Sequence, residues 1–301
     1  MSGLYLLDMP NKLGSLVILI IGGLFSISDS HSSEGKPRVL STISYLHDLV
    51  QIIGGDLVEA ESLMGPGVDP HLYKASARDL GRIKNTDLVF ALGLQLEGRI
   101  NDVLLQLKER GHPLVFVGDT LPKEKLFDAD PHVWFDPELW ILASRTVRDT
   151  LVERLPLKKE TLFSRQLRWE TDLGKIKIEL QKGLNQIPKE KRILVTSHDA
   201  FRYWGRAFDV TVKAIQGIST DSEASLKHIQ ELADELKQKN VPAIFVETSV
   251  SPASIERLQS LTGIKIGGEL YGDALGSPGS SGDTYIKALQ YNTSIFLKAF
   301  Q

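Results

Sequence analysis

Three of the seven histidines stand in similar local sequences, because each occupies a loop that follows an apolar run typical of a β-strand. They are His71, His132 and His198. Asp273 follows a further strand-like run at residues 264–266. In an open α/β sheet, ligands bind outside the carboxyl ends of the strands, so we expect these four side chains to meet in one cleft. Three imidazoles and one carboxylate form a closed shell for a divalent transition metal ion.

The tripeptide Asp-Pro-His occurs twice, at residues 69–71 and 130–132. Proline fixes its own φ angle and biases the preceding residue to an extended conformation, so a ligand after this turn loses little entropy on binding. The remaining histidines have no partner at metal-ligand spacing. They are His31, His47, His112 and His228.

Alternating strand-like and helix-like segments are expected to position these loops, which predicts two parallel-sheet α/β lobes. The expected strands are residues 38–43, 57–63, 87–92, 113–117, 193–196, 210–215, 243–246 and 264–266. The expected helices are residues 45–53, 75–84, 100–110, 137–155, a segment from 199 past 204, 225–239, 252–262 and 284–300.

Residues 157–187 carry heptad-like apolar spacing with charges between, which fits one long helix or two helices with a break near Gly174; the resemblance described below favours the long helix. A long helix between two α/β halves would act as a rigid backbone. The expected organisation is therefore an N-terminal lobe at 36–156, a linking helix at 157–188 and a C-terminal lobe at 189–301.

The first thirty residues have the pattern of a secretory signal peptide. Lys12 precedes an apolar stretch at residues 13–25 and then small residues, and Met9 is an alternative start. An uncleaved membrane anchor is the other interpretation, but the apolar stretch is shorter than the roughly 20 residues a bilayer requires. The chain has no cysteine, so neither a disulfide nor a thioether-linked lipid is expected. A soluble periplasmic protein is predicted.

The net charge and the absence of several sequence motifs argue against several classes of protein. The net charge of −3 gives no basic excess for nucleic acid or an anionic membrane. There is no H-x-x-x-H pair, G-x-S-x-G motif or cysteine nucleophile. A four-donor protein shell also argues against catalysis, because catalytic zinc usually keeps a position for water. A non-enzymatic metal receptor is expected; the alternatives are a metal-dependent hydrolase using a base such as Glu247, or a metal-binding adhesin.

Five segments in order resemble the zinc/manganese receptors of bacterial metal ABC importers. They are GVDPHLY at 67–73, DPHVWFDP at 130–137, TSHDAFRY at 196–203, GISTDSE at 217–223 and GDTY at 282–285. The resemblance implies two α/β lobes joined by a backbone helix, with the metal between them. It carries over His71, His132, His198 and Asp273 as ligands, and implies a monomer that delivers metal to a membrane permease.

The chain departs from two branches of that family. Manganese-selective members often carry Glu where this chain has His198, and many zinc-dedicated members have a histidine-rich loop that residues 119–131 lack. Nitrogen donors bind zinc more tightly than manganese, so Zn²⁺ is predicted as the tighter ligand. A bidentate Asp273 would suit five-coordinate Mn²⁺, which stays the alternative. Asp199, Glu247 and backbone carbonyls are the expected partners for the outer imidazole nitrogens.

Overall fold

The computed structural model describes residues 35–301, so the predicted signal peptide lies outside the described residues. The expected strands are all present: β1 (Arg38–Ser41), β2 (Glu59–Ser62), β3 (Leu88–Ala91), β4 (Leu114–Phe116), β5 (Ile193–Thr196), β6 (Thr211–Ala214), β7 (Ala243–Glu247) and β8 (Lys265–Leu270). The α-helices are α1 (Ser44–Gly54), α2 (Ala77–Lys84), α3 (Asn101–Glu109), α4 (Pro137–Arg154), α5 (Lys159–Leu184), α6 (Arg202–Phe208), α7 (Leu226–Gln238), α8 (Ala253–Thr262) and α9 (Tyr285–Lys298). The predicted α/β class is confirmed.

The N-terminal sheet has the order β2-β1-β3-β4, and every neighbouring pair is parallel. Parallel neighbours need a crossover connection, and α1, α2 and α3 supply it. The central strands β1 and β3 are almost fully buried because helices cover the sheet, whereas the edge strand β2 alternates between exposed and half-buried residues.

In the C-terminal half, β5 pairs with β6 and β7 pairs with β8, again in parallel, and β5 lies beside β7. Strand β8 is longer than expected, since Gly267 and Gly268 hide its pattern in the sequence. The register shifts opposite Ile244 and Phe245, where Gly268 adopts a φ of 149°. Helix α6 begins at Arg202 rather than near Asp199, because the backbone after β5 forms the loop that carries His198.

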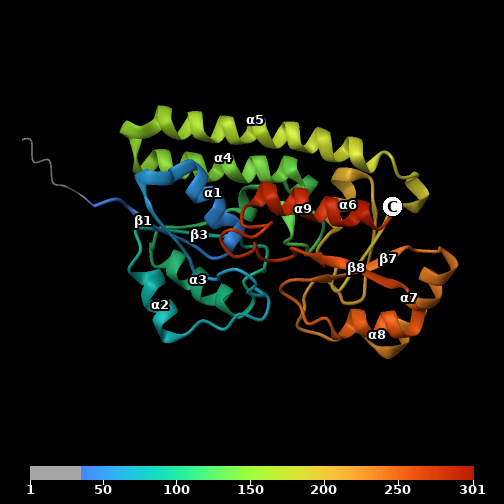
Figure 1. Cartoon of the computed structure of the whole chain (residues 1–301). Coiled ribbons are helices and arrows are strands. Elements are labelled where there is room, and N and C mark those ends of the chain that lie inside the picture. Colours follow the sequence, from blue (N-terminus) through green and yellow to red (C-terminus); the bar gives the residue numbers. More distant parts are fainter. Residues whose placement is uncertain (1–34) are drawn as a thin grey trace, which may run out of the picture. The chain divides into compact units, whose positions relative to one another are not determined.

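Helix α5 is one continuous helix of 26 residues, so the predicted long helix is confirmed and the break near Gly174 is absent. It packs against α1, α4 and α9, which come from both halves of the chain. Figure 1 shows α4 and α5 running side by side along one edge of the structure, with the labelled strands β1, β3, β7 and β8 on the same side of them. Arg165 of α5 also donates to the backbone oxygen of Gly54, which fixes the helix against the end of α1.

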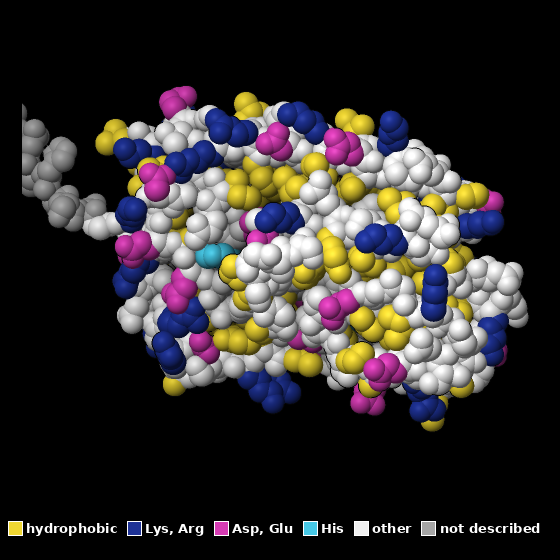
Figure 2. All heavy atoms as spheres, viewed as in Figure 1, with side chains coloured by type: hydrophobic (Ala, Val, Ile, Leu, Met, Phe, Trp, Pro, Cys, Tyr) yellow, Lys and Arg dark blue, Asp and Glu magenta, His cyan; other side chains and the backbone are white. Residues whose placement is uncertain are grey.

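Charged side chains of both signs are scattered among apolar ones over the face in Figure 2. Within residues 35–301, no helix is both long and apolar enough to cross a membrane.

Candidate metal centre

The four side chains predicted as ligands converge on one point. One nitrogen of each imidazole and one oxygen of the carboxylate all lie within 4.8 Å of one another; the residues are His71, His132, His198 and Asp273. All four are buried, with His71 the most exposed at 5%. The convergence therefore forms an enclosed site rather than a surface cluster.

His71 lies in the loop between β2 and α2. Its backbone N–H donates to Asp69 Oδ1 at 2.8 Å, a local turn that fixes the first Asp-Pro-His segment. Asp69 Oδ2 in turn accepts from the Thr220 hydroxyl at 2.7 Å, which ties this loop to the 217–223 motif. Gly98 approaches the His71 carbonyl so closely that a Cβ there would stand 2.6 Å from its oxygen.

His132 precedes the 3₁₀ turn η5 (Val133–Phe135), and the same turn geometry recurs. Its backbone N–H donates to Asp130 Oδ1 at 3.1 Å, and its ring Nδ1 lies 2.8 Å from the same oxygen. This contact leaves Nε2 to face the site, 3.3 Å from His71 Nε2 and 3.3 Å from Asp273 Oδ1. His132 does not directly follow β4, because the turns η3 (Gly118–Thr120) and η4 (Lys123–Lys125) intervene.

His198 follows β5 directly, as expected, and Glu247 at the end of β7 holds it. Glu247 Oε1 accepts from the His198 backbone N–H at 3.0 Å, and Oε2 lies 2.9 Å from Nδ1. The expectation that Glu247 contacts a ligand histidine is confirmed. The expectation for Asp199 is wrong: its carboxylate makes no hydrogen bond to an imidazole within residues 35–301 and instead lies 3.9 Å from Arg202.

Asp273 follows β8, and its carboxylate is directed into the site with both oxygens buried. Oδ1 faces His132 Nε2, and Oδ2 lies 3.2 Å from His198 Nε2 and 3.7 Å from His71 Nε2. Neither oxygen forms a hydrogen bond of good geometry within residues 35–301. A buried carboxylate with two unpartnered oxygens is costly to maintain, so this geometry fits a cation in the centre.

Electrostatics separate the three histidines. Burial lowers the pKa of His71 to about 4, so this ring is neutral. Burial opposes protonation of the other two rings as well, but carboxylates outweigh it: Asp130 and Asp273 raise the pKa of His132, and Asp273 and Glu247 raise that of His198. Burial would raise the pKa of Asp273, yet His198 and His132 hold it well below its usual value. Protons therefore compete with a metal ion for the His132 and His198 rings.

Asp130 is the supporting residue that sequence reasoning missed. Its signal was present in both Asp-Pro-His segments, because an Asp two residues before a turn residue often accepts that residue's N–H. His47, His112 and His228 lie outside the cluster, as expected, and His31 lies outside the described residues.

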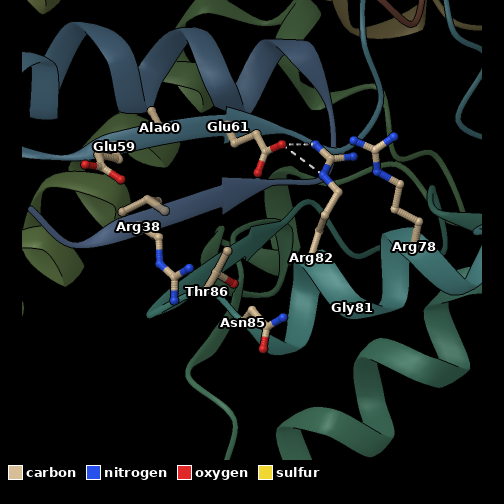
Figure 3. Close-up of a pocket in the computed structure, with 10 residues that line it drawn as sticks. Arg38, Glu59, Ala60, Glu61, Arg78, Gly81, Arg82, Asn85 and Thr86 are labelled. Carbon is tan, nitrogen blue, oxygen red and sulfur yellow. Dashed lines mark hydrogen bonds and ion pairs between the residues drawn. The ribbon is translucent and has the colours of Figure 1, made fainter.

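A separate hollow of about 690 Å³ opens on the N-terminal sheet. Figure 3 shows it between β1, β2 and α2, with Arg82 directed at Glu61 and joined to it. Its lining includes none of the four converging residues, so it is distinct from the candidate metal centre.

Comparison with known proteins places this geometry in a family. Residues 39–299 match the profile of ZnuA, described as zinc-uptake complex component A, periplasmic. The chain belongs to this family.

Two similar proteins are named for two different metals. The chain is 38% identical to the zinc-binding protein TroA of Treponema pallidum, over 90% of this chain and 91% of TroA. It is also 38% identical to the manganese-binding lipoprotein MntA of Bacillus subtilis, over 91% of this chain and 93% of MntA. The solved structure of TroA superposes with a TM-score of 0.85 and covers 88% of this chain and 99% of that one. The α/β architecture expected from the sequence is thus shared with TroA.

Proposed function

We propose that this chain is an extracytoplasmic metal receptor, which captures a divalent transition metal ion with His71, His132, His198 and Asp273 and delivers it to the permease of an ABC importer. The observation that carries the proposal is the buried carboxylate of Asp273, whose two oxygens face three imidazole Nε2 atoms without hydrogen bonds within residues 35–301. Relatives named as metal-binding transport proteins support it.

Zn²⁺ is the favoured cargo and Mn²⁺ the alternative. Three neutral imidazoles suit zinc, and affinity for nitrogen donors is far higher for zinc than for manganese. Both Asp273 oxygens face the site, so a bidentate carboxylate and a five-coordinate ion are accessible, which also suits manganese. The relatives named for zinc and for manganese at equal identity match this chemistry of the donor set.

The receptor interpretation fits the site better than a hydrolase does. A hydrolase would need a free general base beside the metal, and Glu247 is the nearest candidate. Glu247 instead uses one oxygen on the His198 backbone N–H and the other beside His198 Nδ1. It therefore orients a ligand, and activity of the zinc-loaded protein on ester or phosphate substrates would contradict this role.

We also propose the lobe division 36–156 and 189–301, with 157–188 as the linking helix, and export by a signal peptide at 1–30. A protein held by α5 along its length would change the tilt of its lobes only slightly on binding. A monomer is proposed in solution. Sequencing the N-terminus of the secreted protein and measuring its mass in solution test these points.

The decisive experiment is a metal titration of purified, chelator-treated protein at pH 7 with Zn²⁺ and Mn²⁺. His132→Ala and His198→Ala should each weaken binding severely, since each removes one buried donor from the four-donor shell. His228→Ala is the matched control, because His228 lies on α7 outside the cluster and makes only a 3.5 Å contact with the Ala214 oxygen. Equal losses in all three variants would contradict the ligand set.

A further inference from the structure

We propose that Ser44, Tyr45 and Asp48 of helix α1, here named the α1 clamp, are positioning residues that hold Asp273 in the orientation needed to receive a metal ion. This inference rests on the proposed function and adds to it residues remote in sequence from every ligand. The clamp also gives a role to the GDTY motif at 282–285, which the ligand set leaves unexplained.

The orientation of Asp273 needs an explanation because nothing fixes its side chain directly. Its oxygens meet only the three histidines of the site, and neither has a hydrogen bond of good geometry within residues 35–301. The direction of the carboxylate is therefore set by the backbone that carries it. That backbone is the segment 271–284 between β8 and α9, which lacks regular α or β structure.

Helix α1 holds this segment at two points and the first residue of α9 at a third, each through a hydrogen bond to the main chain. The Tyr45 hydroxyl donates to the Gly272 oxygen at 3.0 Å, the Leu275 N–H donates to Ser44 Oγ at 2.9 Å, and the Tyr285 N–H donates to Asp48 Oδ2 at 3.0 Å. The first two contacts lie on either side of Asp273. The third anchors the start of α9, directly after the segment.

The Gly272 carbonyl accepts a second hydrogen bond in addition to the one from Tyr45. The second donor is Trp134 Nε1 at 3.3 Å, and the Trp134 ring stacks on Tyr45 with centroids 5.0 Å apart and planes 19° apart. Trp134 lies edge-on to His132, with centroids 5.3 Å apart. One aromatic pair thus supports both the residue before Asp273 and the ring of a second ligand.

All three clamp residues are buried, and the Tyr45 hydroxyl remains a hydrogen-bond donor at physiological pH. Tyr45 is 1% exposed, and burial together with the charge of Asp273 raises the pKa of its hydroxyl well above the usual value. From helix α9, the Asn292 side chain accepts from the Tyr271 N–H at 2.9 Å and donates to the Tyr271 oxygen at 2.8 Å. The segment is therefore held by two helices before an ion arrives, and such preorganisation increases affinity.

The test compares Tyr45→Phe with Tyr285→Phe in the full-length mature protein. Tyr285 is the matched control: its ring is equally buried in the same aromatic cluster, but its hydroxyl has no hydrogen-bond partner within residues 35–301. Zn²⁺ affinity is measured by chelator competition, and the visible spectrum of the Co²⁺-loaded protein reports coordination number and geometry. Tyr45→Phe should weaken Zn²⁺ binding about fivefold relative to Tyr285→Phe, the effect of one net hydrogen bond, and should alter the Co²⁺ spectrum.

A second pair keeps the test independent of the aromatic core. Ser44→Ala leaves the Leu275 N–H without its acceptor, whereas Ser41→Ala removes a buried hydroxyl that has no partner within the described residues. Ser44→Ala should weaken binding about fivefold or more and alter the Co²⁺ spectrum, whereas Ser41→Ala should not. Unchanged affinity and spectrum in both Tyr45→Phe and Ser44→Ala, beside wild-type protein that binds tightly, would overturn the clamp alone. Wild-type protein that binds no metal would overturn the proposed function instead.

Discussion

Replacing Asp130 by Asn tests how much the support of a ligand ring contributes to metal affinity. Asp130 is 2% exposed, and its Oδ1 accepts from the His132 backbone while lying 2.8 Å from the ring Nδ1. Loss of such a partner lowers metal affinity about 10–100-fold. Because the Asn side-chain oxygen can still accept from Nδ1, we expect the smaller effect: about tenfold, or about 1.4 kcal/mol.

The pH dependence of that loss gives a second readout. The Asp130 carboxylate raises the pKa of His132, so removing its charge makes the ring easier to deprotonate. Relative to wild type, Asp130→Asn therefore loses less affinity at low pH, where the ion competes with a proton for the His132 ring. The loss is largest at high pH, where this ring is neutral in both proteins.

The assay is competition with a chromophoric zinc chelator across this pH range, and Asp199→Asn is the control. The Asp199 side chain lies next to His198 in sequence but contacts no imidazole through a hydrogen bond within residues 35–301, so its replacement should change affinity by less than about twofold. If Asp130→Asn binds as wild type does, or if both variants lose affinity equally, the reasoning about ring support is wrong.

Three further outcomes are expected. Because the pKa values of His132 and His198 are raised, Zn²⁺ affinity should begin to decline, as the pH is lowered, before the pH reaches the ordinary histidine pKa of about 6.5. Because of the same shifts, the metal-free protein should lose stability as the pH rises through the raised pKa values of these two histidines, which thermal melts with and without zinc will show. Zinc at a hundred times its Kd should raise the free energy of unfolding by about 2.7 kcal/mol, and a chelator should reverse the change in calorimetry. Gly98→Ala should destabilise by about 1–2 kcal/mol in denaturant unfolding, because Gly98 has a φ of 46° and faces the His71 carbonyl, whereas Gly65→Ala, with open space around it, should not.

Local patterns sufficed for much of this structure. Apolar periodicity located the strands and helices, the family resemblance favoured the unbroken α5, and the repeated Asp-Pro-His pointed to His71 and His132. The pattern was weaker where glycine interrupted it: Gly267 and Gly268 shortened the expected β8. Adjacency in sequence misled for Asp199, because the next residue along a loop need not direct its side chain to the same place.

Most long-range pairings were not predicted from the sequence. Glu247 was expected beside an imidazole, but its pairing with His198 in particular depends on β7 lying beside β5, and the hydrogen bond from Tyr45 to the Gly272 oxygen joins residues 227 positions apart. Such contacts depend on how the sheets and α1 pack, and no spacing within one segment encodes them. The convergence of the four proposed ligands was predicted because a resemblance and a strand-end rule both placed them in one cleft.

The four proposed ligands lie at positions as far apart as 71 and 273, in a chain that contains no cysteine. A bound ion would therefore be a reversible cross-link between remote parts of the polypeptide, in the place where an exported protein often has a disulfide. Unlike a disulfide, this link is released each time the cargo is handed over. The emptied protein should then be cleaved faster by proteases than the loaded one, so its lifetime outside the cytoplasm would depend on the metal supply.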